Sequence, residues 1–137
     1  MPSTEELPAL LDDFTRNTKG VHGVIICSRD GLLLASSEQF AGEVAEHFSA
    51  ITSGVYSLAR AVPEKFPDAG QPRTLLLEYG SAMLLIMAAG ENALFVVYTD
   101  SGINTEQAAY DANLIIQQIP DHVTVPPRWQ PHPQSAL

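Results

Sequence analysis

The sequence is poor in the residues on which most enzymes and nucleic-acid-binding proteins depend. Its 137 residues include one cysteine, Cys27, so neither an internal disulfide nor a cysteine-rich metal site can form. The only lysines are Lys19 and Lys65, and neither follows the glycine-rich loop with which nucleotide hydrolases hold phosphate. Seven basic against sixteen acidic residues give a formal charge of -9, which disfavours binding to nucleic acid or to an anionic membrane.

Patterns typical of catalysis are also missing. The four histidines are scattered along the chain, and no serine occupies a Gly-x-Ser-x-Gly turn. Cys27 has no base beside it in the sequence and is expected to be a small residue of the core. We therefore expect no catalytic residues, no metal ligands and no cofactor.

Long hydrophobic runs are absent too. The longest uninterrupted apolar run, from Ala82 to Ala89, is much shorter than the roughly 18 residues that a membrane span needs. The first residues lack the basic segment and cleavage pattern of a secretion signal. With 45% hydrophobic and 17% charged residues, the composition is that of a folded domain. We expect a cytoplasmic protein that does not insert into membranes.

Hydrophobic periodicity predicts the order helix, strand, strand, helix, three strands, helix. The expected helices cover 5–17, 42–62 and 104–119, and the expected strands cover 21–28, 32–35, 73–79, 82–89 and 93–99. This order predicts an α/β fold in which one five-stranded antiparallel sheet lies between helices. Residues 1–120 are expected to form the domain and 121–137 a proline-rich, extended or disordered tail.

The central helix carries two different stripes. One stripe is apolar, as a helix covering a sheet requires, and consists of Val44, Phe48, Ile51, Val55, Leu58, Ala59 and Val62. Beside it runs a stripe of small residues, which are Ala50, Ser53, Gly54, Ser57 and Ala61. A glycine inside a helix costs about 1 kcal/mol relative to alanine, so this stripe favours close contact with another helix. A plain surface of weakly interacting residues is the alternative.

The third strand contains the run Leu75-Leu76-Leu77, which does not alternate between apolar and polar residues. Two explanations are open: helices cover both faces of the sheet at this strand, or a second subunit covers one face. An apolar strand at the edge of a sheet invites uncontrolled pairing unless a partner covers it. We therefore expect a homodimer.

Three interpretations are open for Trp129, which lies in the tail between Pro127 and Pro131. It is an aromatic anchor in a short recognition segment, it folds back onto Tyr110 and Leu114 of the last helix, or it makes no fixed contact.

Five short segments carry a resemblance to a known family through their order and spacing. They are GVHGV at 20–24, SRDGL at 28–32, AITSGVYSLA at 50–59, RTLLLE at 73–78 and LLIMA at 84–88. They resemble the roadblock / dynein light chain family, over about residues 7–119. The bacterial branch of that family, encoded beside a Ras-like small GTPase and a sensor histidine kinase, is the most similar.

The resemblance implies a profilin-like three-layer fold and a non-enzymatic regulator or scaffold of the GTPase. It also implies a homodimer that pairs the third strand and the central helix across a two-fold axis. It is compatible with recruitment of the protein to a membrane through a partner. The expected dimer interface consists of Ala50, Gly54, Ser57, Ala61, Leu75 and Leu77. The expected GTPase-binding surface, on the outer side of the paired helices, consists of Glu46, Ser49, Ser53 and Arg60. A small-molecule sensor of profilin-like shape is the alternative function, and it would need a pocket between sheet and helix.

Overall fold

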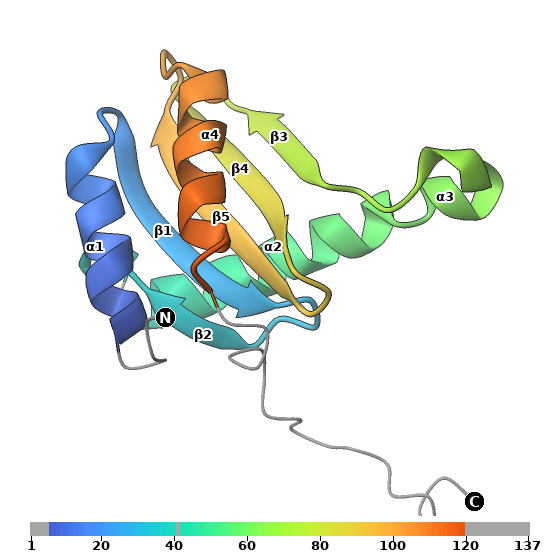
Figure 1. The fold of residues 1–137 in the computed structure, drawn as a ribbon, viewed down its shortest axis with the longest axis horizontal. Coiled ribbons are helices and arrows are strands. Elements are labelled where there is room, and N and C mark those ends of the chain that lie inside the picture. The colour runs from blue at the N-terminus through green and yellow to red at the C-terminus, as the bar shows by residue number, and fades with distance from the viewer. Residues whose placement is uncertain (1–5, 41, 120–137) are drawn as a thin grey trace, which may run out of the picture.

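A five-stranded antiparallel sheet forms the centre of the computed structural model, which describes residues 6–40 and 42–119. In chain order the elements are α1 (Leu7–Asn17), β1 (Val21–Ser28), β2 (Leu33–Ser36), η2 (Glu38–Phe40), α2 (Glu43–Ala59), α3 (Val62–Lys65), η3 (Pro67–Ala69), β3 (Thr74–Glu78), β4 (Ala82–Ala89), β5 (Ala93–Asp100) and α4 (Thr105–Ile116). The strands lie in the order β2-β1-β5-β4-β3 (Figure 1). The predicted α/β fold with one antiparallel sheet is therefore confirmed.

The largest difference in element boundaries lies between the central helix and the third strand. α2 ends at Ala59 rather than at Val62, and the predicted loop at 63–72 contains most of α3 and all of η3. Pro63 and Pro67 lie in the first turns of these short helices, where a missing N–H breaks no helical hydrogen bond. The predicted tail at 121–137 lies outside the described residues.

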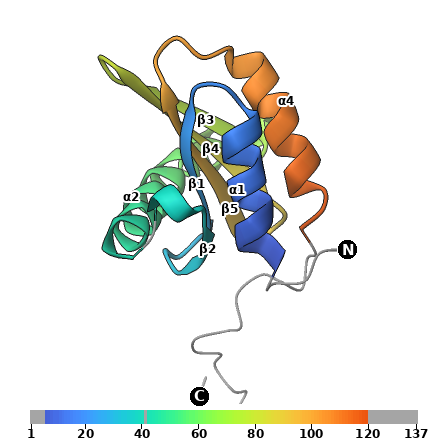
Figure 2. The same ribbon diagram turned by 90° about the vertical axis from the view of Figure 1, so that its left-hand side faces the viewer.

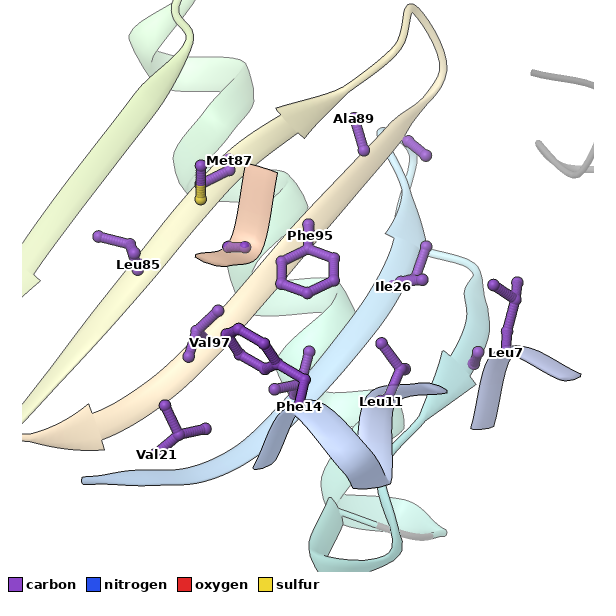
Figure 3. Close-up of a cluster of buried hydrophobic side chains, with 14 residues drawn as sticks. Leu7, Leu11, Phe14, Val21, Ile26, Leu85, Met87, Ala89, Phe95 and Val97 are labelled. Carbon is purple, nitrogen blue, oxygen red and sulfur yellow. The ribbon is translucent and has the colours of Figure 1, made fainter. Parts of the chain in front are cut away.

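The sheet is the middle of three layers. α1 and α4 cover one face, and α2 covers the other (Figure 2). On the first face, Leu7, Leu11 and Phe14 point from α1 into a cluster of buried side chains (Figure 3). The Phe14 ring meets the Phe95 ring of β5 edge-on, with 5.7 Å between the ring centroids. Leu7, Leu11 and Phe14 lie at the i, i+4, i+7 spacing of one helical face.

Local hydrogen bonds fix the start of α4 and the turn between β1 and β2. The side chain of Asn104 accepts a hydrogen bond from the Gln107 amide at 3.1 Å and caps the first turn of α4. In the β1–β2 turn, the Ser28 hydroxyl accepts from the Leu32 amide at 2.8 Å. Gly31 adopts a φ of 96° in this turn, a conformation that favours glycine.

The orientation of α2 differs from the prediction. The bulky apolar stripe was expected to face the sheet, and Phe48 and Val55 do pack against the core cluster there. Val44, Ile51 and Leu58 of the same stripe are instead 49%, 54% and 77% exposed. The side chains that α2 buries are Ala45, Ser49, Thr52, Ser53 and Tyr56. The helix is thus rotated about its axis so that a face of mostly small and hydroxyl-bearing residues packs on the sheet.

Hydrogen bonds within the helix explain why this polar face can be buried. The hydroxyls of Ser49, Thr52 and Ser53 donate to the carbonyls of Ala45, Phe48 and Ala50, at 2.9, 2.7 and 3.0 Å. Each hydroxyl therefore keeps a partner after it leaves water, which removes most of the cost of burying it. Only Tyr56 is large among the buried residues of α2, and its hydroxyl donates to the Pro72 carbonyl at 2.9 Å.

We predict that Gly23→Ala destabilises the fold. A Cβ atom at this position would lie 2.9 Å from the ring of Phe40, which is buried and stacks on Phe48. The forced shift should lower the free energy of unfolding by roughly 1–3 kcal/mol, measured by urea denaturation at fixed protein concentration.

The matched control is Gly102→Ala, because a Cβ atom at Gly102 meets none of the described atoms within 4 Å. Equal stability of the two variants would contradict the packing of η2 against β1.

Candidate functional site

The edge of the sheet at β3 is open. β3 pairs with β4, and no other strand of the described residues pairs with it. The Tyr79 amide donates to the Ala82 carbonyl at 2.8 Å, and the Ala88 amide donates to the Arg73 carbonyl at 2.9 Å. Because hydrogen bonding alternates along an antiparallel pair, odd-numbered residues of β3 bond to β4 and even-numbered residues turn their N–H and C=O groups to the free edge. The free-edge residues are Thr74, Leu76 and Glu78.

The side chains of β3 leave apolar surface on both faces of this edge. Leu75 and Leu77, two predicted interface residues, are half-buried in the cluster on the α2 side. Leu76 points to the other face and is 43% exposed. Neither sheet face is fully covered at β3, whereas nearly all of β4 is buried by the layers on both sides. The opposite edge differs, since β2 has only four residues and contacts both α1 and α2.

A second open surface is the outer face of α2, which we define by its exposed apolar and small residues. The apolar members are Val44, Ile51 and Leu58, and the small members are Ala50, Gly54, Ser57 and, just beyond the helix end, Ala61. A Cβ atom at Gly54 would meet none of the described atoms within 4 Å. Four residues of the small stripe expected to contact another helix are therefore exposed in the single chain, whereas its fifth member, Ser53, is buried.

The four residues expected to bind a partner do not share one surface. Glu46 and Arg60 are exposed. Ser49 and Ser53 are 0% and 7% exposed, and Ser53 lies against the β1–β2 turn near Gly31. The prediction that these two serines lie on the outer side of the helix is wrong, because the hydroxyl-bearing face of α2 packs on the sheet.

An apolar groove of about 670 Å³ lies between α2 and the β3–β4 turn. Its lining residues are Phe48, Ile51, Tyr79, Gly80, Ser81, Ala82, Leu84 and Tyr98. Phe48 is also part of an aromatic cluster, with ring centroids 4.8 Å from Phe40 and 5.8 Å from Tyr98. No sequence pattern indicates this groove, because three separate segments of the chain form it.

Arg29 is a residue whose structural role the sequence did not reveal. Its guanidinium carbon lies 5.0 Å from the centroid of the Tyr56 ring, and its Nη2 donates to the Gly90 carbonyl at 3.0 Å. Arg29 thereby joins the β1–β2 turn, the β4–β5 turn and α2. The only available signal was its place in the segment SRDGL.

Features that would indicate metal binding or membrane insertion are absent from the described residues. Within residues 6–40 and 42–119, no three side chains of His, Cys, Asp or Glu gather where they could hold a metal ion. None of the helices among these residues is long and apolar enough to cross a bilayer. Cys27 lies between β1 and α2, and burial raises the pKa of its thiol to about 11, although the Thr52 hydroxyl 3.8 Å from its Sγ opposes this shift.

We predict that the native Cys27 thiol resists a disulfide reagent at pH 8. A pKa raised from 9.0 to about 11 alone lowers the thiolate fraction by about 100-fold, and burial blocks access further. The rate is measured by absorbance in buffer and in denaturant. Because the folded pKa lies above the unfolded one, Cys27 also makes the fold lose stability as the pH rises from about 9 towards 11. Equal rates in buffer and denaturant would contradict the buried position.

Comparison with known proteins places this geometry in a family. The family model of the Roadblock/LC7 domain matches residues 8–99. One crystal structure of a Roadblock/LC7 domain from Streptomyces avermitilis is 30% identical, with a TM-score of 0.69, and the match covers 83% of this chain and 98% of that chain. A second from the same organism is 22% identical, with a TM-score of 0.77, covering 81% and 92%. No curated protein sequence matches the chain.

More distant structures share the fold. The gliding protein MglB from Thermus thermophilus is 16% identical, with a TM-score of 0.71, and the match covers 85% of this chain and 88% of that chain. Profilin II from Acanthamoeba castellanii is 20% identical, with a TM-score of 0.55, covering 80% and 96%. The motifs, the three layers and the family match agree, and this chain belongs to the Roadblock/LC7 domain family.

Proposed function

We propose that this protein is a non-enzymatic homodimeric regulator or scaffold of a Ras-like small GTPase in bacterial signalling. The observation that carries the proposal is the open edge of β3 beside the exposed outer face of α2. The GTPase, and a sensor histidine kinase of the same operon as a further partner, follow from the family resemblance. We expect the protein to act in the cytoplasm and to reach a membrane only through a partner.

The free edge of β3 suits pairing with a second copy of itself. Its outward residues, Thr74, Leu76 and Glu78, are spaced symmetrically about Leu76. A two-fold axis at Leu76 would bring Leu76 opposite its counterpart and Thr74 opposite Glu78, and it would join two sheets into one of ten strands. Such pairing satisfies the outward N–H and C=O groups and protects the edge from uncontrolled association.

The outer face of α2 supports the same arrangement. Val44, Ile51 and Leu58 lie on one side of the helix, so their exposed side chains form one continuous apolar strip. A second α2 packed on them would remove this surface from water. Ala50 and Gly54 beside them carry almost no side chain, so the two helices can approach closely.

Charge supports a basic partner surface. The formal charge of -9 on each chain would steer association toward a positive patch on the GTPase. Glu46 and Arg60 remain exposed near opposite ends of α2, at the border of the apolar surface that the second copy would cover. We expect these two residues to contact the GTPase, with Ser49 and Ser53 excluded by their burial.

We predict that Gly54→Arg converts the dimer into a monomer without unfolding it. The side chain has open space in the single chain but would occupy the helix contact in the dimer. Light scattering during size-exclusion chromatography should give twice the chain mass of 14.8 kDa for wild type and the single chain mass for the variant.

Gly102→Arg is the control, because position 102 is also open and lies before α4 on the other side of the molecule. It should remain dimeric. A wild-type protein of single chain mass at micromolar concentration would contradict the homodimer.

We predict that Glu46→Lys weakens capture of the GTPase encoded beside this protein by about fivefold while the dimer persists, because it sets a positive charge against the basic patch. Arg60→Glu should strengthen capture, because it adds negative charge at the same rim. Binding is measured by pull-down with the GDP- and GTP-loaded GTPase at two salt concentrations. Glu106→Lys on α4 is the charge-matched control. Unchanged binding by both variants, with loss of binding in the control, would put the partner on the α4 face.

The groove beside the β3–β4 turn favours one alternative, a small-molecule sensor. Its aromatic and aliphatic lining suits an apolar ligand, and its volume is within the range of ligand sites. A sensor predicts a bound compound in the native mass spectrum of protein purified under mild conditions, and an unoccupied dimer would oppose it.

A further inference from the structure

We propose that the apolar groove of each subunit holds the C-terminal arm of α2 from the other subunit. The arm consists of residues 58–66, which include the end of α2 and all of α3. The inference rests on the proposed homodimer and states which segment fills the groove. It assigns a role to two features that the single chain leaves unexplained.

The first feature is the arm itself, whose apolar side chains have little to pack against. Leu58, Val62 and Phe66 are 77%, 53% and 68% exposed, and they recur every four residues. The end of α2 and α3 project beyond β3, away from the rest of the sheet (Figure 1). Backbone hydrogen bonds from Ala61 to Leu58 and from Phe66 to Val62 keep the arm close to helical. An ordered helical arm with an apolar side is a recurring means of recognition in which a groove receives the helix.

The second feature is the groove, whose apolar lining matches the apolar side chains of the arm. Phe48 and Ile51 line its helix side, and Leu84 and Tyr98 line its sheet side. Ile51 is 54% exposed and Tyr79 is 56% exposed. Among the residues that the structure describes, no charged side chain lines the groove. An apolar helix segment would therefore leave no buried charge without a partner.

The geometry of β3 brings the two features together. The Tyr56 hydroxyl, bonded to the Pro72 carbonyl at 2.9 Å, holds the end of α2 at the start of β3. A two-fold axis at Leu76 sets Pro72 opposite Gly80 of the second copy, since the two positions are equally far from Leu76. Gly80 and Ser81 line the groove and are exposed. The arm, which begins two residues after Tyr56, would thus leave its own sheet directly beside the groove of the second copy.

The exchange would be reciprocal, because a two-fold axis repeats every contact. Two arms would enter two grooves, at both ends of the paired β3 strands. The contact would extend the interface well beyond strand pairing and would leave the groove closed to small molecules in the dimer.

A chemical cross-link tests the contact directly. In the full-length double variant Val62→Cys with Ser81→Cys, a short bismaleimide should link two chains and give a band of twice the chain mass on a denaturing gel. Cys27 stays out of the reaction because it is buried. The control Val62→Cys with Asn113→Cys carries its second thiol on the exposed surface of α4 and should give no such band.

A second measurement keeps the test independent of linker geometry. Ser81→Arg would obstruct the groove and should raise the dimer dissociation constant by about tenfold, since burial of an apolar arm is lost. Asn113→Arg should leave it unchanged. Both constants come from sedimentation analysis of dilution series.

The outcomes separate the two proposals. A monomeric wild-type protein would contradict the homodimer and, with it, the arm contact. A dimer that gives no cross-link and whose affinity Ser81→Arg does not change would overturn the arm contact alone. A dimer that fails both tests and retains a bound compound would assign the groove to a ligand.

Discussion

The rest of the structure depends on the contact between the hydroxyl-bearing face of α2 and the sheet. Ser49, Thr52 and Ser53 can be buried because each hydroxyl donates to a carbonyl of its own helix. Since the small face packs inward, the bulky side chains Val44 and Leu58 must point outward. A helix of the opposite orientation would have hidden its apolar stripe and left the molecule complete as a single chain. The observed orientation instead leaves apolar surface on α2, next to the open edge of β3.

That surface gives the account of function its physical basis. The free edge offers backbone groups to a partner strand, and α2 offers side chains to a partner helix, so a second copy can satisfy both at once. The described residues contribute no cluster that could hold a metal ion. A regulator of this kind would present a composite surface that exists only in the dimer. The acidic charge of the chain would then help to select the partner.

Sequence patterns predicted the elements better than their orientation. The Asp30-Gly31 turn and the Asn104 cap follow from local signals, since Asp-Gly favours a tight turn and Asn favours a helix N-terminus. The rotation of α2 was not, since periodicity identifies a bulky face without saying whether a sheet or a second molecule covers it. Buried serines look like surface residues in a sequence, which is why Ser49 was assigned to the wrong side. The groove could not be predicted, because it forms only when distant segments meet.

The exchange of the Leu76 amide with solvent deuterium, followed by NMR, tests the central claim most directly. The amides of Leu75 and Leu77 bond to β4 and should be protected in any folded form. We expect the Leu76 amide of wild type to be protected as well, and to lose protection on dilution as the dimer dissociates. Rapid exchange of Leu76 at high concentration, beside protected neighbours, would mean that the edge of β3 is unpaired and would contradict the account.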